Sequence, residues 1–204
     1  ARSKGTRQRQ AAAITRQVAD KMIDATGTRP IDCRDRALLL VMRDLLARRS
    51  EIVALDVADI TINDDGTATA LIRRGKTDQT GQGAVRLIGP GATAALKAWL
   101  AVAKIEAGPV FASLTRGGAV RDRLPAGDVA RILKRMATRA KVEHAADISG
   151  HSARVGMAQD LTAHGCELAA VMQAGRWATP AMPARYAEHL QARRGAVAVF
   201  YGLR

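Results

Sequence analysis

Four short stretches of the sequence each place basic side chains at the start of a predicted helix or in a predicted turn. They read "ARRSEI", "RGKTD", "GHSAR" and "AGRW", and "ARYAEH" follows them with a tyrosine. Taken singly, each is explained by solvated charge or by packing. Together they hold the groups that can handle a phosphodiester without a metal ion. Guanidiniums can bind the phosphate, a phenol can attack phosphorus, and a lysine or histidine can protonate the leaving oxygen.

The stretch "SGHSARVGMAQDL" puts a cation pair where a helix is expected to start. His151 and Arg154 lie three residues apart in the first turn of a helix predicted over 149–163. A helix start already attracts anions, because its unpaired N–H groups and its dipole carry partial positive charge. A histidine and an arginine beside that end therefore indicate an anionic guest such as a phosphate.

The sequence lacks the signatures of several other enzyme classes. Its four histidines do not have H-E-x-x-H spacing, its two cysteines do not form C-x-x-C, and no acidic cluster is placed to hold two magnesium ions. The "GKT" at 75–77 lacks the glycine that a phosphate-binding loop carries five residues before Gly75. We therefore expect no metal site and no cofactor.

The chain is strongly basic. Its 204 residues include 32 Lys or Arg and 19 Asp or Glu, which gives a net charge of +13. This excess favours a polyanionic partner, and a basic protein without a nucleic-acid role is the alternative. No apolar run approaches the ~20 residues of a membrane span, and no signal peptide is visible. Because Cys33 and Cys166 are best explained as reduced thiols, we expect a cytoplasmic protein with no membrane partner.

The elements that would position these residues are mostly helices. Apolar periodicity predicts helices at Ile14–Met22, Arg34–Ala47, a short segment capped by Ser50, Ala92–Ala103 with Trp99 facing inward, Asp128–Ala140 with Val129, Ile132, Leu133 and Met136 facing inward, and 149–163, 167–173 and 179–191. Strands are predicted at 60–62, 67–74 and 84–88, and "GPVFASLTRGG" at 108–118 is expected to be a loop. The expected fold is α+β, mainly helical with a small three-stranded antiparallel sheet.

The order and spacing of the motifs resemble the catalytic domain of the tyrosine recombinases, also called the phage integrase family. The resemblance runs from about residue 10 to 200 and rests on "LLARRSEIVALDVADI", "RRGKTDQTG", "SGHSARVGMAQDL" and "MQAGRWATPAMPARYAEH". It implies a site-specific DNA recombinase or integrase that cleaves and rejoins strands through a 3′-phosphotyrosyl intermediate, without metal or ATP. Two alternatives stay open: a catalytically inactive DNA-binding remnant, and DNA relaxation of the type IB topoisomerase kind.

The resemblance gives each matching residue a role. The catalytic set is Arg48, Lys76, His151, Arg154, Trp177 and Tyr186. Arg48 and Arg154 would clamp the phosphate, and Glu51, three residues after Arg48, would position the site groups. Arg49 competes with Arg48 for the first arginine, and we prefer Arg49 as a neighbour that binds DNA.

The remaining roles concern the proton and the nucleophile. Lys76 would act as general acid towards the 5′-oxygen, and His151 would assist proton transfer. Trp177 stands where many members of the family carry histidine; it would donate its indole N–H to the phosphate. Tyr186 would be the nucleophile, since Tyr201, the second of two tyrosines, lies four residues from the end of the sequence.

The resemblance also implies an organisation and partners. Residues 1–10 read as a basic linker that would join an N-terminal DNA-binding domain, 11–192 as the catalytic domain, and 193–204 as a tail that could dock on a neighbouring protomer. The expected partner is double-stranded DNA, bound as a homo-tetramer on paired sites, with this domain alone weak or monomeric. Further candidates for DNA binding are Arg7, Arg9, Arg49, Arg73 and Arg74.

Overall fold

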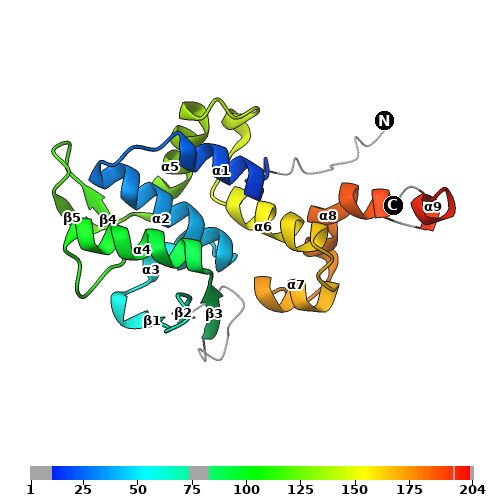
Figure 1. The fold of residues 1–204 in the computed structure, drawn as a ribbon, viewed down its shortest axis with the longest axis horizontal. Coiled ribbons are helices and arrows are strands. Elements are labelled where there is room, and N and C mark those ends of the chain that lie inside the picture. Colours follow the sequence, from blue (N-terminus) through cyan, green and yellow to red (C-terminus); the bar gives the residue numbers. More distant parts are fainter. Residues whose placement is uncertain (1–10, 74–82, 195, 203–204) are drawn as a thin grey trace, which may run out of the picture.

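The computed structural model describes residues 11–73, 83–194 and 196–202. Within these ranges the chain is mostly helical, with a small sheet at one edge of the helical body (Figure 1). The helices before the sheet are α1 (Arg16–Asp24), α2 (Pro30–Asp44) and α3 (Arg49–Ala54), followed by the turn η1 (Val57–Asp59). After the sheet come α4 (Pro90–Ala103), α5 (Ala126–Arg139), η2 (Ala145–Asp147), α6 (Ser152–Ala163), α7 (Leu168–Gly175), α8 (Ala181–Arg194) and α9 (Ala196–Phe200).

The strands form two antiparallel sheets. The predicted sheet is confirmed: β1 (Ile60–Ile62), β2 (Ala68–Ile72) and β3 (Ala84–Ile88) pair in the order β1-β2-β3. A second hairpin, β4 (Ala112–Leu114) with β5 (Val120–Arg123), corrects the loop predicted at 108–118. These strands have three and four residues, and every residue of β5 is exposed. They therefore lack the alternation of apolar and polar residues that reveals a strand in a sequence.

The helix α2 lies at the centre of the core. Its side chains Leu38, Leu39, Val41 and Met42 are fully buried, and such burial stabilises the fold by about 1.5–3 kcal/mol for each large apolar side chain. α4 packs across α2, and the indole Nε1 of the buried Trp99 donates to the Val110 carbonyl at 2.8 Å. The predicted inward positions of α5 are buried as well.

Most helices start within two residues of the predicted position, but α2 and α6 start four and three residues away from it. α2 begins at Pro30 instead of Arg34, since proline at the first helical position has its φ already set for the helix. α6 begins at Ser152 instead of Ser149, because the Ser149 N–H donates to the Ser152 hydroxyl at 2.9 Å and closes a turn first. His151 is therefore the N-cap residue of α6, and Arg154 stands in its first turn.

α6 lies unusually close to the segment that precedes α1. A Cβ atom on Gly156 would lie 1.9 Å from the Ile14 carbonyl oxygen, so only glycine allows this approach. The Ile14 N–H donates to the Ser152 carbonyl at 3.0 Å, and Arg43 of α2 donates to the Ile14 carbonyl. Arg43 also reaches Asp160 of α6 at 2.6 Å. These contacts fix the helix that carries Arg154 against the body.

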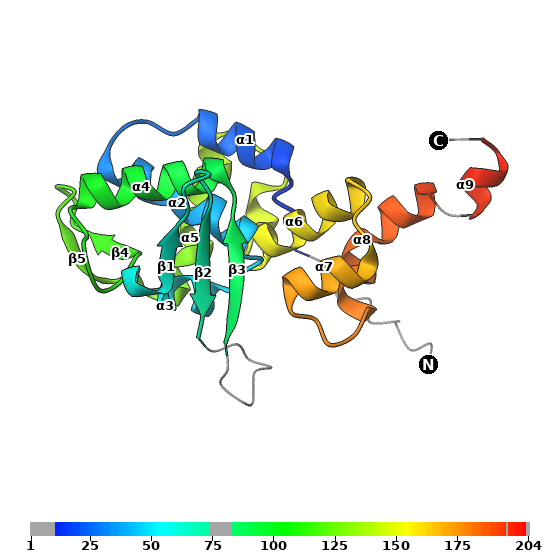
Figure 2. The same cartoon turned by 60° about the horizontal axis from the view of Figure 1, so that its bottom comes forward.

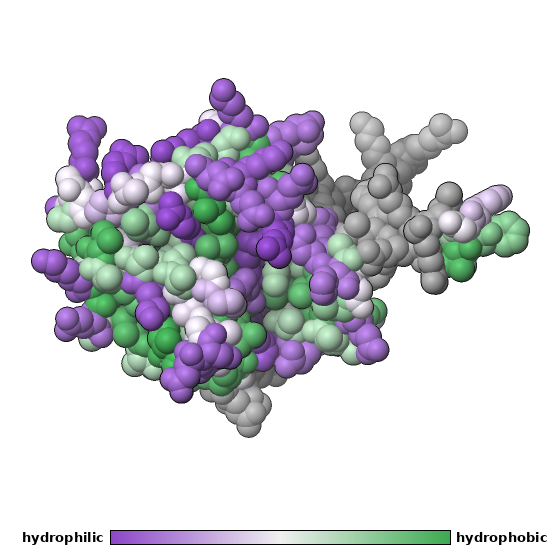
Figure 3. All heavy atoms as spheres, viewed as in Figure 1, coloured by the Kyte–Doolittle hydropathy of each residue, from purple (hydrophilic) through white to green (hydrophobic). Residues whose placement is uncertain are grey.

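The last helices extend from α6. α7 and α8 contact α6, while α8 and α9 leave the body on the side away from β4 and β5 (Figures 1 and 2). Hydrophilic side chains gather along the α1 and α5 side of the face in Figure 3. Across the described ranges, no helix combines the length and the apolar character that a membrane crossing requires.

Candidate active site

The start of α3 places Arg48 and Glu51 side by side. Arg48 is the N-cap residue, and the Glu51 Oε2 accepts its backbone N–H at 2.8 Å. The Glu51 Oε1 accepts Arg48 Nη1 at 2.6 Å. The Glu51 side chain is 3% exposed and that of Arg48 is 21% exposed, so the carboxylate holds the guanidinium at the mouth of the site. The prediction that Ser50 caps this helix is wrong, because the Glu51 carboxylate reaches back to the first N–H groups.

Arg48 and Arg49 take different directions. Arg49 is exposed, and its Cδ lies 3.2 Å from the place a Cβ on Gly150 would occupy. The Arg49 side chain thus lies over the turn before α6, whereas Arg48 is held by Glu51. This arrangement favours Arg48 as the first arginine of the site and leaves Arg49 at its rim.

Arg154 is the buried cation of the site. It is 2% exposed, and its two Nη nitrogens donate to the carbonyls of Leu46 and Gly175. Its Cζ lies 4.3 Å from the centroid of the Trp177 ring, a cation–π contact. Burial, and then the charges of Arg48 and Arg176, lower the pKa of Arg154 to about 10, so the group stays charged at neutral pH. Arg154 and Arg48 belong to one region, because Arg154 donates to the carbonyl of Leu46, two residues before Arg48.

Trp177 connects Arg154 to Tyr186. The two rings pack edge to face, with centroids 5.9 Å apart and an interplanar angle of 67°. A Cβ on Gly175 would lie 2.0 Å from Cζ3 of Trp177, so glycine at 175 makes room for the indole. The Gln159 side chain donates to the Tyr186 carbonyl at 3.0 Å and ties α8 to α6. Arg154, Trp177 and Tyr186 therefore form one continuous set of contacts.

Two groups of the site have shifted pKa values. Burial raises the pKa of Tyr186, although Arg154, Arg185 and Arg48 oppose the shift. The phenol therefore keeps its proton at neutral pH. Partial desolvation, followed by the charges of Arg154 and Arg49, lowers the pKa of His151. A neutral imidazole at the rim can accept a proton from a phenol or pass one on.

Some predicted residues are not among the contacts of the site. Four of them, Arg7, Arg9, Arg74 and Lys76, fall outside the described residues. In the sequence, Lys76 stands between Ile72, the last residue of β2, and Ala84, the first residue of β3, and these two residues are paired. Arg73 has an exposed side chain that reaches Asp59 at 2.5 Å. Tyr201 follows α9, 67% exposed, with its ring against Phe200. Of the two tyrosines, Tyr186 is the one that contacts Trp177.

The structure adds Arg176, to which the sequence analysis gave no role. Its Nη2 lies 2.5 Å from Glu51 Oε2, so one carboxylate receives both Arg48 and Arg176. The "AGRW" stretch singled the residue out, but its partner lies 125 residues away in the chain. Among the residues the structure describes, no group of three His, Cys, Asp or Glu side chains is arranged to hold a metal ion.

Comparisons with known proteins give the family of this chain. The model of the phage integrase family matches residues 12–193. The chain is 28% identical over 208 residues to the recombinase Cre of Escherichia phage P1, covering 95% of this chain and 61% of that protein. It is 31% identical over 196 residues to an integrase/recombinase XerD homolog of Selenomonas ruminantium, covering 92% of this chain and 57% of that protein. The chain thus spans about three fifths of these relatives.

The fold is also that of a solved recombinase. The XerH site-specific recombinase, in a post-cleavage complex with a palindromic difH substrate, superposes with a TM-score of 0.75 at 17% identity. The likeness covers 98% of this chain and 56% of that one. Since the family match spans residues 12–193 and takes in each site residue described above, the chain belongs to the phage integrase family.

Proposed function

We propose that this chain cleaves and rejoins DNA strands as a site-specific recombinase, through a 3′-phosphotyrosyl intermediate on Tyr186 and without a metal ion or ATP. The observation that carries the proposal is the chain of contacts from the buried Arg154 through Trp177 to Tyr186. It links a phenol, through the indole ring, to a guanidinium that forms no ion pair with a carboxylate of the described residues. A phosphodiester is the guest that uses both groups.

The guanidiniums would bind the phosphate before the reaction. Arg48 and Arg154 each keep N–H groups that their protein partners do not use, since a guanidinium carries five. Two forks on the non-bridging oxygens stabilise the added negative charge of a five-coordinate phosphorane. The Trp177 indole N–H would supply a further donor, and it cannot serve as a base.

The bonds then exchange in one displacement. The Tyr186 oxygen forms a bond to phosphorus while the bond from phosphorus to the 5′-oxygen breaks. The phenol loses its proton to an acceptor such as the neutral His151, and Lys76 protonates the leaving 5′-oxygen. In the reverse direction a 5′-hydroxyl attacks the phosphotyrosyl bond, which conserves the energy of the broken linkage. No nucleotide is consumed.

Double-stranded DNA is the proposed partner. The net charge of +13 supports a grip on the phosphate backbone, which makes binding strongly dependent on salt. The XerH recombinase was solved in a post-cleavage complex with its difH substrate, which supports cleavage as the activity proposed for this chain. We further propose that four copies act on paired sites and that the 193–204 tail contacts a neighbouring protomer.

Capture of the covalent intermediate tests the proposal. The chain is incubated, in the presence of a chelator, with labelled duplexes of randomised sequence that carry a nick, so that the short strand released by cleavage diffuses away. We expect an adduct that survives denaturation and is absent in Tyr186→Phe, while Tyr201→Phe retains it because Tyr201 does not contact the site residues.

Three results would count against the proposal. Binding without any adduct would favour a catalytically inactive remnant. Relaxation of supercoiled plasmid regardless of sequence would favour the topoisomerase activity. An adduct that persists in Tyr186→Phe would move the nucleophile to another residue.

A further inference from the structure

Arg176 occupies a backbone conformation that favours glycine. It is the C-cap residue of α7, with φ 56° and ψ 46° in the left-handed region. Glycine reaches this region at the least cost, because a Cβ atom crowds the following carbonyl. Lys104, the C-cap residue of α4, has nearly the same conformation, with φ 52° and ψ 42°. Lys104 is exposed on the surface, whereas the Arg176 side chain is only 12% exposed.

The Arg176 side chain joins the end of α7 to α3 and to Leu45, the residue that ends α2. Its Nη2 lies 2.5 Å from Glu51 Oε2, and its Nη1 lies 3.5 Å from the Leu45 carbonyl. The carboxylate is buried, so its contacts are weakly screened by water. Arg86 of β3 gives α7 a second anchor by donating to the Gln173 carbonyl at 2.9 Å. Among the residues that the structure describes, Arg176 alone connects the end of α7 to a group that also holds Arg48.

The residues on both sides of Arg176 belong to the site. The Gly175 carbonyl accepts a hydrogen bond from Arg154, and the Trp177 ring lies over the same guanidinium. The turn 175–177 therefore surrounds Arg154 from one side. A shift of this turn would move Trp177 and, through the ring contact, Tyr186.

We propose that Arg176 is a positioning residue that acts through Glu51. It fastens the 175–177 turn to α3, so that Arg154, Trp177 and Tyr186 face Arg48. It also shares the single negative charge of Glu51, so that this carboxylate does not cancel Arg48 and the site stays positive towards a phosphate. The inference rests on the proposed function, because the reaction whose groups are positioned is strand cleavage.

A double-mutant cycle on cleavage tests this role. The rate of adduct formation is measured at saturating DNA for Arg176→Gly and Glu51→Gln, singly and together, with the DNA dissociation constant measured alongside. We expect Arg176→Gly to lower the rate about 30-fold or more, as for loss of one partner of a buried charge pair, while the dissociation constant changes less than about threefold. In the Glu51→Gln background the same substitution should change the rate less than about threefold.

Lys104→Gly is the matched control, since it makes the same backbone change and removes one positive charge from another helix C-cap. It should cleave like the unmodified chain. Arg176→Lys should restore part of the rate lost in Arg176→Gly, because it returns the charge to Glu51 without the planar fork. If Arg176→Gly is unfolded at the assay temperature, Arg176→Lys replaces it in the cycle, with an expected loss of about tenfold.

The outcomes separate this inference from the proposed function. Equal effects of Arg176→Gly in both Glu51 backgrounds, or a rate within about threefold of the unmodified chain, would overturn the positioning role. A parallel loss of rate and of DNA affinity would also overturn it, since that pattern marks general disruption. Absence of a Tyr186-dependent adduct in the unmodified chain would instead overturn the proposed function.

Discussion

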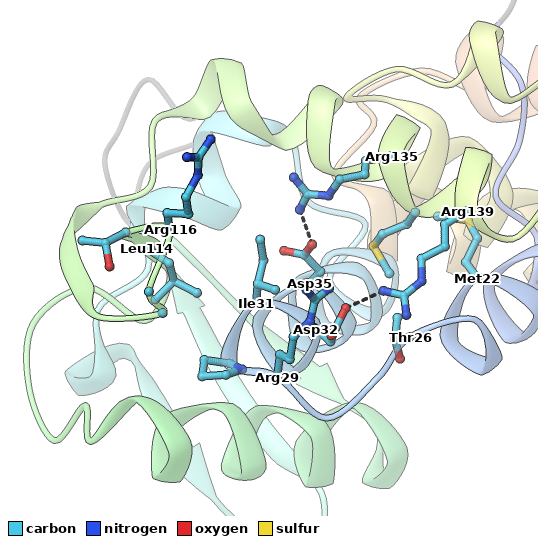
Figure 4. Close-up of a pocket in the computed structure, with 15 residues that line it drawn as sticks. Met22, Thr26, Arg29, Ile31, Asp32, Asp35, Leu114, Arg116, Arg135 and Arg139 are labelled. Carbon is cyan, nitrogen blue, oxygen red and sulfur yellow. Dashed lines mark hydrogen bonds and ion pairs between the residues drawn. The ribbon is translucent and has the colours of Figure 1, made fainter.

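Two clusters of arginine side chains differ in how their charge is balanced. In the first, which we call the α2–α5 cluster, Asp32 receives Arg29 at 2.9 Å and Arg139 at 2.7 Å, and Asp35 receives Arg34 and Arg135. Figure 4 shows Arg135 and Arg139 reaching these carboxylates at the wall of a cavity of about 730 Å³. The carboxylates are buried, but the Arg29 and Arg139 side chains are 71% and 45% exposed. Water solvates the excess positive charge.

In the second cluster, at the site, the excess charge is sheltered. Arg48 and Arg176 share Glu51, and Arg154 finds carbonyls and an indole ring but no carboxylate in the part of the chain that is described. Burying a charge costs several kcal/mol unless another charge compensates it. The α2–α5 cluster is therefore complete as it stands. The site cluster leaves positive charge that an anionic guest would compensate.

The largest expected effect comes from replacing one arginine of each cluster by lysine, which removes the planar guanidinium but keeps the charge. Arg154→Lys should lower the rate of adduct formation about 100-fold or more, because lysine cannot reproduce two parallel hydrogen bonds to a phosphate. Arg135→Lys, in the α2–α5 cluster, should leave the rate within about threefold of the unmodified chain. Near-normal cleavage by Arg154→Lys would remove the contrast between the clusters.

A second substitution should act on stability alone. Asp32→Asn leaves Arg29 and Arg139 without their carboxylate, and it should lower the free energy of unfolding by about 1–3 kcal/mol in urea titrations. Burial by itself would raise the pKa of Asp32, but the hydrogen bonds and charges of Arg29 and Arg139 bring it below the usual value. The difference between the two proteins should thus be full above pH 3.8 and disappear as the pH falls through the folded-state pKa. If Asp32→Asn cleaved more slowly than the unmodified chain under conditions where both are fully folded, the α2–α5 cluster would have a role in cleavage and not in stability alone.

The smallest expected effect is on the pKa of His151, which responds to the positive charges of the site cluster. Desolvation and the charges of Arg154 and Arg49 hold the pKa of His151 below 6.5, so this group favours the folded state above that pH and opposes it as the pH falls. In NMR titrations, Arg49→Gln should raise the His151 pKa, and so should added salt in the unmodified chain. Arg121→Gln, an exposed change on β5, should leave it unaltered. If the His151 pKa is the same in Arg49→Gln as in the unmodified chain, the charge of Arg49 does not affect His151.

The long helices and the three-stranded sheet were predictable because their apolar faces follow the period of the structure they form. Trp99 and the inward face of α5 are examples. The β4–β5 hairpin was not predictable, since its strands are short and β5 buries no side chain. The start of α6 depends on a hydroxyl contact between Ser149 and Ser152, and sequence periodicity carries no information on such a contact.

The site shows the same limit. Arg48 and Glu51 lie three residues apart in the sequence, and the resemblance assigned both to the site. The link from Arg176 to Glu51 crosses 125 residues and depends on where α7 ends in space. The preference for Arg48 over Arg49 came from the resemblance, and the structure adds its physical reason in the direction of the two side chains. The catalytic and DNA-binding roles of all these residues stay predictions, and Lys76, Arg74, Arg7 and Arg9 also fall outside the described residues.

The close crossing of Gly156 and Ile14 couples the first described residues to the helix that carries Arg154 of the candidate site. The gap between Gly156 and the Ile14 backbone is too small for a methyl group, so α6 cannot move towards this segment without displacing it. A displacement of residues 11–13 would therefore be transmitted directly to α6, which begins at Ser152 and carries Arg154 in its first turn.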